Sequence, residues 1–340
     1  MIKLYSASAC LGLLTAAALC LPQSSAAAKL EDVVRAFEKN KDYVQPIATI
    51  FGSTTNSGWY QSSAVPATFS FYVGLPLNLS LIADADRSFK GTWTDNGCKQ
   101  YHKNNPTGTQ TCKETTSYTA PTLFGSGKGP VLDSSAYSPT TNSIAGTFHV
   151  PQNDGNANAA SFNWFPFGEP QIGFSYYNTE LKLRYFTLPL DVVSVSLPGI
   201  GIQHDLSSFL PPLPVSLSVA ANWTWLSGEW KPGGKVDGKV TLNGTSAFYG
   251  VLGGYTYSRW LEVFLETGWE TASLKTGGDL VIHNDSGDEL VRPGLTLEGR
   301  NGFRASLNIA FHFGYDAVLG QNLGANFGNQ VGVLAYRYKK

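Results

Sequence analysis

The sequence predicts an all-β protein, a transmembrane antiparallel β-barrel of about 12 strands, within a range of about 10 to 14, that is preceded by a short N-terminal α-helix. The first observation is composition: only 14% of the 340 residues are charged, where soluble domains average about 25%. Aromatic residues reach 13%, and 36 residues are glycine. These figures exclude a disordered chain, and a formal net charge of -1 provides no electrostatic footprint for nucleic acid.

The second observation is a set of long runs in which apolar and polar residues alternate. From Phe69 to Leu81 every odd position is apolar, while the even positions carry mainly small or polar residues. The same period of two recurs over 215–225 and 305–313. Such alternation predicts strands with one apolar and one polar face.

The length of these runs favours a membrane barrel over a β-sandwich. They span about 9–14 residues and end in aromatic residues, whereas ordinary strands have about 5–6 residues. After the N-terminal segment no apolar run reaches the roughly 18 residues of a membrane helix, and lipid admits only helices or closed barrels. A secreted sandwich or a soluble barrel is the alternative.

Further strands are expected elsewhere along the chain. Residues 261–270 are ambiguous, because Glu262, Glu266 and Glu270 stand four apart and would line one face of a helix. Gly268 and the β-rich flanks favour a strand. The other expected strands are 171–177, 181–188, 192–205, 248–257, 261–273 and 330–338, with weaker ones at 89–93 and 144–150.

The N-terminus has the features of an export signal, predicted over residues 1–28. Lys3 precedes an apolar run over 7–21, and Ala26-Ala27-Ala28 provides a small-residue cleavage site. A lipoprotein signal through Cys20 is the alternative, although the bulky Leu19 precedes that cysteine. The expected location is therefore the outer membrane of a Gram-negative-type bacterium.

An amphipathic helix is predicted from Lys29 to about Ala48, because Leu30, Val33, Val34 and Phe37 recur at helical spacing. Its end is expected near 43–46. Residues 29–66 are predicted to form a plug or cap, either inside the barrel or on its periplasmic side, and residues 67–340 the barrel. No convincing helix is predicted after Ala67.

Residues 84–165 are the least strand-like part and are predicted to be a long loop region outside the cell or in the lumen. Cys98 and Cys112 lie in this region, and in an exported chain they are expected to form a disulfide. Two unlinked thiols are the alternative. A lone cysteine pair without a nearby histidine pair does not predict a zinc site.

The sequence contains no pattern that predicts a catalytic residue, a metal site or a cofactor site, and no enzyme is therefore expected. A G-x-S-x-G elbow and a P-loop are both absent from the sequence, and His204-Asp205 with Ser207 reads as a polar rim turn. Asp84 to Asp86 and Asp285 to Asp288 resemble calcium-loop fragments but lack the completing ligands.

Charged residues on the polar strand faces are the candidate site. These faces could shape solute preference, or the charges could pair across the lumen and bind the N-terminal helix. The predicted lumen-lining residues are Lys182, Arg184, Glu262, Glu266, Glu270, Arg304 and His312.

Several segments resemble an uncharacterised family of bacterial outer-membrane proteins, a domain of unknown function with a signal peptide, a short helix and a β-barrel. They are NSGWY (56–60), APTLFG (120–125), PQIGFSYYNTELKLRYF (170–186) and GIGIQHDLSSFLPPLPVSLSVA (199–220). More loosely, the chain is similar to fatty-acid-transporter-like barrels, in which an N-terminal segment plugs the lumen. The resemblance implies architecture and location, and no activity.

The expected function is passage or binding of a small solute through a plugged barrel. A non-conducting structural or surface-exposed barrel is one alternative, and a barrel-embedded or secreted hydrolase is another. The expected partners are outer-membrane lipid, the outer-membrane assembly machinery and a small-molecule solute, without nucleic acid. The alternating Leu334, Tyr336 and Tyr338 suit a closing strand for that machinery, and the final Lys339 and Lys340 depart from the usual aromatic end.

Overall fold

The computed structural model describes residues 41–107, 111–151, 164–209, 215–233, 236–284, 287–313, 315–322 and 330–339. The predicted signal peptide and residues 29–40 of the predicted helix lie outside these ranges. The chain divides into two compact units, one formed by Met1–Ile82 with Phe162–Lys340 and the other by Ala83–Ser161.

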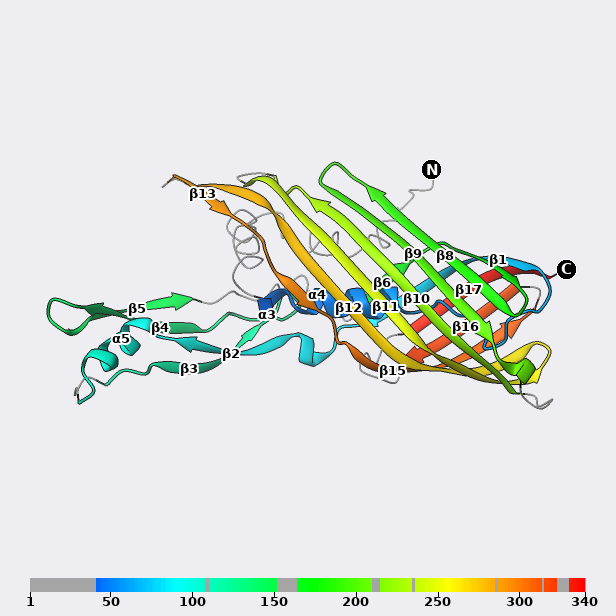
Figure 1. Cartoon of the computed structure of the whole chain (residues 1–340). Helices are drawn as coiled ribbons and strands as arrows, with labels where there is room; N and C mark the ends of the chain where they lie inside the picture. The colour runs from blue at the N-terminus through cyan, green and yellow to red at the C-terminus, as the bar shows by residue number, and fades with distance from the viewer. Residues whose placement is uncertain are drawn as a thin grey trace, which may run out of the picture. The chain divides into compact units, whose positions relative to one another are not determined.

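The first unit is a large antiparallel sheet whose strands lie side by side and inclined, as Figure 1 shows for β8 to β12. Its strands are β1 (Ser70–Leu81), β6 (Trp164–Gly168), β7 (Gln171–Tyr176), β8 (Thr179–Pro189), β9 (Val193–Asp205), β10 (Val215–Trp230), β11 (Val236–Ser258), β12 (Leu261–Asn284), β13 (Gly287–Val291), β14 (Thr296–Glu298), β15 (Gly302–His312), β16 (Tyr315–Asn322) and β17 (Gln330–Lys339).

The pairings close this sheet into a ring. The first strand β1 pairs with the last strand β17, and β11 pairs with β12, so the path from β11 through β1 and β17 returns to its start. β6 and β7 both pair with β1, so together they count as one position in the ring of strands. β13, β14 and β15 all pair with β12 and likewise count as one position. In the described ranges the ring has ten positions, within the predicted range. The predicted antiparallel barrel is thus confirmed.

In the part of the barrel nearer the end where β1 begins, the outward side chains are apolar and the inward ones polar. On β8, Leu181, Leu183 and Tyr185 are exposed, whereas the intervening Lys182 and Arg184 are buried. We call the outward apolar surface the apolar band. Aromatic side chains flank it at both ends: Tyr185, Trp223, Trp225, Tyr249, Trp269 and Phe303 at one, and Tyr176, Tyr177, Tyr255, Tyr257, Trp260 and Phe313 at the other.

Beyond the first of these aromatic rows the polarity of the wall inverts. On β10 the outward side chains change from Trp225 to Ser227 and Glu229, and the inward ones from Thr224 to Leu226. We call the part of the wall past this level the extension. Its inward side chains are apolar and buried, and they include Val193, Val195, Leu197, Leu226, Trp230, Val236, Val240, Leu242, Leu274, Leu280, Ile282, Val291 and Leu297.

In the part of the chain described before β1 there are two helices, α3 (Lys41–Val44) and α4 (Pro46–Thr55). The first of these helices ends at Val44, within the predicted region of 43–46. The second was not predicted, and Pro46 occupies its first turn, where the fixed φ and missing N–H of proline are tolerated. Every residue of α4 is buried. None of the helices in the described ranges has the length and apolar character needed to cross a membrane.

The second unit contains two β-hairpins and a helix in place of the predicted loop. β2 (Ser88–Thr94) pairs with β3 (Thr115–Pro121), and β4 (Val131–Ser138) pairs with β5 (Ser143–Pro151). The predicted absence of helices after Ala67 is wrong, because α5 (Asn96–Asn104) follows the N-cap Asp95. Short 3-10 turns lie at Asp84–Asp86 and Ser207–Phe209.

Asp95 and a disulfide stabilise this second unit. The Asp95 carboxylate accepts hydrogen bonds from the N–H groups of Gly97 and Cys98 and from the N–H and hydroxyl of Ser135 on β4. Partial burial opposes ionisation, yet these hydrogen bonds bring the pKa of Asp95 below its ordinary value. Cys98 and Cys112 form the predicted disulfide.

Candidate functional site

The segment from Lys41 to Pro66 fills the interior of the barrel, and we call it the plug. Its polar atoms contact inward residues of β1, β8, β9, β10, β11 and β12, which occupy six of the ten positions of the ring. In Figure 1 α4 is seen behind β11 and β12. The plug is therefore enclosed by the wall.

The first half of the plug is apolar and lies in the extension. Phe51 and Leu274 both pack over the inward Gly244, and Gly52 lies against Ala272. Gln45 donates a hydrogen bond to the backbone oxygen of Glu298 on β14. Tyr43, Val44, Ile47 and Ile50 are also buried.

The second half of the plug is polar and lies at the level of the apolar band. The hydroxyls of Ser53 and Ser80 are 2.7 Å apart, as are those of Thr55 and Ser246. The Asn78 amide donates to the backbone oxygen of Thr54 at 2.8 Å. The change from apolar to polar contacts along the plug thus coincides with the inversion of the wall.

Two buried cations of β8 contact the middle of the plug. Lys182 Nζ donates to the backbone oxygen of Trp59 at 3.0 Å and lies 2.9 Å from a Glu180 carboxylate oxygen. Arg184 Nη1 donates to the backbone oxygen of Ser57 at 2.9 Å and pairs with Glu169 at 3.4 Å. Its guanidinium lies 4.0 Å from the Trp59 ring centroid, a cation–π contact.

Buried charges on β12 and β15 pair with one another. Arg304 lies 3.4 Å from carboxylate oxygens of both Glu266 and Glu270, and 5.5 Å from the Phe248 ring centroid. The cross-strand register places Glu266 opposite Ser306 and Glu270 opposite Gly302, so Arg304 lies between the two glutamates.

A second carboxylate site binds the end of the plug. Glu262 accepts hydrogen bonds from the Ser62 hydroxyl at 2.7 Å and from the Ser63 N–H at 2.8 Å, and His312 lies 3.4 Å away. Asp205 accepts a hydrogen bond from the Val65 N–H at 3.0 Å. The segment that leads into β1 is therefore bound by two acidic side chains.

All seven predicted lumen residues lie on the inner face of the barrel, and the structure divides them into three groups. Lys182 and Arg184 contact the plug directly. Glu262 also contacts the plug, and His312 pairs with Glu262. Glu266, Glu270 and Arg304 form a cluster within the wall. The sequence analysis did not identify Glu169, Glu180, Gln171, Gln203, Asp205 and Asn222, which complete these contacts.

Two glycines of β9 make room for Trp59. A Cβ atom at Gly199 would lie 3.0 Å from the indole, and one at Gly201 would lie 2.7 Å from it. Any other residue at Gly201 would therefore displace the ring or the strand. Gly199, Gly201 and Gln203 occupy alternate positions of β9 and so lie on the same inward face. This spacing is the sequence pattern that could have indicated them.

His204 and Asp205 lie at the end of β9. His204 Nδ1 lies 2.8 Å from the Thr179 hydroxyl, while Asp205 accepts a hydrogen bond from the Ser207 N–H. In the second unit, Cys98, His102 and Cys112 cluster closely enough for a metal. The disulfide occupies both sulfurs, and a metal would require thiolates.

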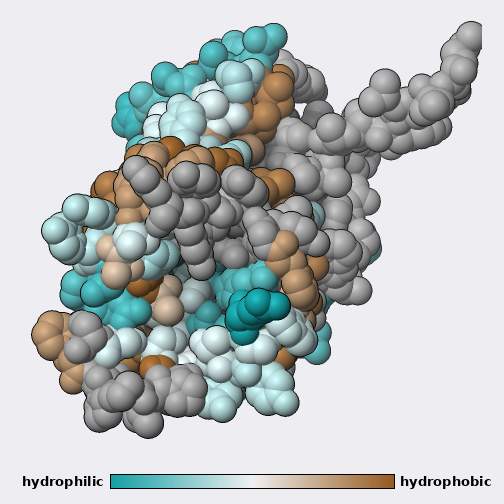
Figure 2. Space-filling view, turned by 90° about the vertical axis from the view of Figure 1, so that its right-hand side faces the viewer, coloured by the Kyte–Doolittle hydropathy of each residue, from teal (hydrophilic) through white to brown (hydrophobic). Residues whose placement is uncertain are grey.

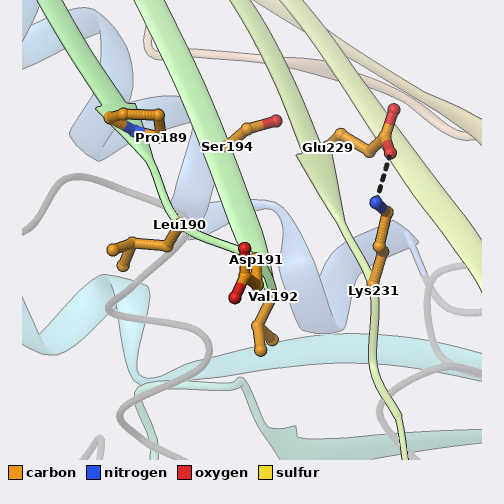
Figure 3. Close-up of a pocket in the computed structure, with 7 residues that line it drawn as sticks. All are labelled: Pro189, Leu190, Asp191, Val192, Ser194, Glu229 and Lys231. Atoms are coloured by element: carbon orange, nitrogen blue, oxygen red, sulfur yellow. Dashed lines mark ion pairs between the residues drawn. The ribbon is translucent and has the colours of Figure 1, made fainter.

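A surface pocket of about 370 Å³ lies on the outside of the extension, apart from the plug. Leu190, Asp191 and Val192 of the β8–β9 turn form one side, and Glu229 and Lys231 form another (Figure 3). Glu229 and Lys231 pair at 3.6 Å, and a second lysine, Lys239, binds Glu229 at 2.8 Å. The charges of this pocket are thus paired locally.

These features define the class of the protein, a closed antiparallel β-barrel with polar contacts between its inner face and residues 41–66. The chain belongs to a family of unknown function, DUF6588, whose model matches residues 2–330. This confirms the predicted resemblance to an uncharacterised family. No curated protein matches the chain significantly.

Solved structures of low similarity include outer-membrane barrels. The translocator domain of autotransporter NalP from Neisseria meningitidis is 11% identical, with 81% of this chain and 89% of that chain covered and a TM-score of 0.29. A Pseudomonas aeruginosa FadL homologue is 11% identical, with 88% and 98% covered and a TM-score of 0.23. The Ralstonia pickettii toluene transporter TbuX is 9% identical, with 85% and 93% covered and a TM-score of 0.26.

Proposed function

We propose that this protein is an outer-membrane β-barrel that binds or passes a small solute, and that the plug closes its lumen until it rearranges. The proposal includes no catalytic role. Its membrane part rests on the apolar band between two rows of aromatic side chains, the arrangement expected of a wall in contact with lipid. On β12 the band runs from Leu261 to Trp269, the length of about 9–11 residues that a tilted membrane strand needs.

The connections between strands give the barrel an orientation. At the end where β1 begins and β17 finishes, two-residue turns join β7 to β8 and β11 to β12, and the longest connection, from β9 to β10, has nine residues. At the opposite end, residues 82–163 connect β1 to β6. Short turns typify the periplasmic side of such barrels, and long connections the outside. We therefore assign the short-turn end to the periplasm and the extension to the cell exterior. Figure 2, which views the molecule from the side of the short-turn end, shows a band of hydrophobic residues below a hydrophilic group at the top of the view.

The gating proposal rests on the chemistry of the contacts between the plug and the wall at the level of the apolar band. They are hydrogen bonds of serine and threonine hydroxyls and of backbone oxygens, which water can replace when the plug moves. Two atoms of the Arg184–Glu169 pair beside the plug, Arg184 Nη2 and Glu169 Oε1, are buried without a hydrogen-bond partner in the described part of the chain. Hydration of these atoms would offset part of the cost of opening.

A second candidate function is a non-conducting envelope barrel. It is favoured by the aromatic core inside the lumen, where Trp59, Tyr60, Tyr72 and Phe248 pack together with Leu252 and Phe264. A filled lumen of this kind suits a purely structural barrel. The two candidates differ in whether the plug moves, and they can be separated by restraining it.

A reversible disulfide between plug and wall provides the test. The Thr55 and Ser246 hydroxyls are 2.7 Å apart, so T55C/S246C places two thiols within bonding reach. We expect planar-bilayer conductance or solute uptake to be lost when this disulfide is oxidised and restored by a dithiol reductant. Wild-type protein with the same reductant controls for reduction of Cys98–Cys112.

Each outcome decides between the candidates. If oxidised T55C/S246C conducts as well as wild type, the plug does not close the lumen and the gating proposal is wrong. If wild-type, oxidised and reduced proteins are all silent in bilayers and take up no solute, the non-conducting barrel is the better description. Free solubility of the mature protein without detergent would contradict both.

A further inference from the structure

The disulfide of the second unit has a histidine beside it. Cys98 and His102 stand four residues apart in α5, so their side chains lie on one face of that helix. His102 Nε2 lies 3.8 Å from Cys112 Sγ, and the potential ligand atoms of Cys98, His102 and Cys112 all lie within 4.8 Å of one another. Two sulfurs and one imidazole nitrogen are thus gathered at one point.

A carboxylate orients this imidazole. Glu114 Oε1 lies 2.6 Å from His102 Nδ1, so Nε2 is the ring nitrogen left to face the sulfurs. Zinc-binding histidines have the same arrangement, in which one ring nitrogen binds the metal and the other donates to a carboxylate. The side chains of His102 and Glu114 are 35% and 43% exposed, so a cation can reach them from solvent.

The frame around these residues does not depend on the disulfide. β2 and β3 pair up to the residues that flank this segment, and the Asp95 N–H donates to the backbone oxygen of Glu114 at 2.9 Å. The Asp95 carboxylate also caps α5 and binds β4. The hairpin and the helix cap therefore keep Cys98 and Cys112 close together when the bond between their sulfurs is broken.

We propose that Cys98, His102 and Cys112 bind a zinc-type divalent cation when their disulfide is reduced, with Glu114 as a positioning residue. Thiolate and imidazole are ligands that zinc prefers, and three protein ligands leave the fourth tetrahedral position to water. In such a tetrahedron sulfur and nitrogen lie about 3.6 Å apart, near the observed 3.8 Å. This site goes beyond the proposed function and does not depend on the orientation of the barrel.

Reduction and binding form a balanced exchange. A dithiol donates two electrons and two protons, so its own thiols become a disulfide while the Cys98–Cys112 bond breaks to two thiols. The cation then replaces both thiol protons, which pass to solvent. The two sulfurs separate to about 3.8 Å in a tetrahedral site, and rotation of the half-buried Cys112 side chain provides this movement. Oxidation reverses the exchange and releases the cation.

The test is a Co²⁺ titration of the full mature protein in detergent, followed by absorption. A phosphine reduces the disulfide before Co²⁺ is added, and charge transfer from thiolate to Co²⁺ reports on the sulfur ligands. We expect one Co²⁺ to bind per reduced chain and none per oxidised chain. Zn²⁺ should then displace Co²⁺, because N and S ligands generally bind zinc more tightly.

Substitutions separate this site from binding by two thiols alone. E114A should weaken Co²⁺ binding by about 10–100-fold with little change in the spectrum, and E114D should recover part of the loss. H102A removes a ligand, so it should weaken binding further and change the spectrum. H283A removes a histidine of the first unit and should have no effect. Absence of free thiol in each oxidised variant shows that the second unit has folded.

Three results would overturn the site. Reduced wild type that binds no Co²⁺ would show that these residues hold no cation. Equal affinity and equal spectra of wild type and H102A would show binding by the two thiols alone. Equal binding by oxidised and reduced wild type would place the cation elsewhere. All three leave the conductance tests of the barrel untouched, so the two proposals fail separately.

Discussion

The two levels of the barrel interior are built on opposite principles. At the level of the apolar band, the interior contains buried ion pairs such as Arg184–Glu169 and Arg304–Glu266. In the extension, the interior contains side chains such as Leu274 and Leu297. The same strands supply both interiors. The two levels differ in the medium outside the wall. Where the wall meets lipid, the apolar face of each strand points outward; where it meets water, the polar face points outward and the apolar face points into the core.

The plug repeats this division, and so it specifies its own position. Its apolar α4 residues match the extension, and its serine, threonine and asparagine residues match the polar lumen. Sliding the plug along the axis would place Phe51 among charges and Thr55 among leucines. The inversion therefore fixes the register of the plug, and the following substitutions test it.

The largest effect is expected from removing the cation of the wall cluster. R304M leaves Glu266 and Glu270 buried without a counter-charge, which should lower the free energy of unfolding by about 3–5 kcal/mol. R292M is the control, because the Arg292–Asp279 pair on the extension is exposed and should contribute only about 0–1 kcal/mol. Denaturant midpoints in detergent measure both. Equal losses would contradict the difference between the two levels.

The next effect concerns the outward surface. V251K puts a charge into the middle of the apolar band and should cost about 2–4 kcal/mol in a bilayer. T245K places the same charge on the outward face of the extension, where we expect about 0–1 kcal/mol. Folding into lipid vesicles, followed by heat-modifiable gel migration, compares them. If T245K is as damaging as V251K, the boundary between band and extension is misplaced.

A smaller effect is expected where plug and wall touch. G201L collides with Trp59 and should cost about 1–3 kcal/mol by overpacking, and it should also increase conductance because the plug is displaced. Gly253 is the matched control, since a Cβ there meets nothing within 4 Å. Bilayer recordings of G201L and G253L measure this difference. A silent G201L barrel that folds normally would argue against a mobile plug.

The smallest effect is a pH dependence at the tip of the extension. Hydrogen bonds to Asp237 at 2.9 Å and Asp288 at 2.8 Å raise the pKa of His283. A raised pKa means that the charged form of His283 is favoured in the folded state. The ion pairs that His283 makes between β11, β12 and β13 therefore stabilise the fold fully below the unfolded pKa of about 6.5. This stabilisation is lost as the pH rises through the pKa of His283 in the folded protein. Hydrogen exchange of the β12–β13 hairpin should therefore quicken with pH, beyond the intrinsic trend, in wild type but not in H283N.

Prediction from sequence succeeded where one rule applied along a whole strand. The alternation over 69–81 and 305–313 gave strands close to those observed, Ser70–Leu81 and Gly302–His312. It covered only part of β11 and β12, which are predicted over 248–257 and 261–273 but observed over Val236–Ser258 and Leu261–Asn284. The residues missed belong to the extension, where the inverted polarity breaks a pattern that assumes lipid outside.

Local chemistry explains the helices that were misjudged. The helix that begins at Pro46 was not predicted, although a proline suits the first turn of a helix, and every residue of this helix is buried inside the wall. The helix α5 depends on Asp95, whose carboxylate also binds Ser135 on β4, a partner 40 residues away. No local window contains that partner.

The sequence by itself determined which face of each strand is apolar, and therefore the barrel class, the inward position of Lys182, Arg184, Glu262, Glu266, Glu270, Arg304 and His312, and the Cys98–Cys112 pair. Only the tertiary structure decided what those inward charges contact. Alternation reports the side on which a residue lies, because successive side chains point to opposite faces. It carries no information on distance across the lumen, and so the ring closure, the partners Glu169 and Asp205, and the threading of the plug depend on the closed wall itself.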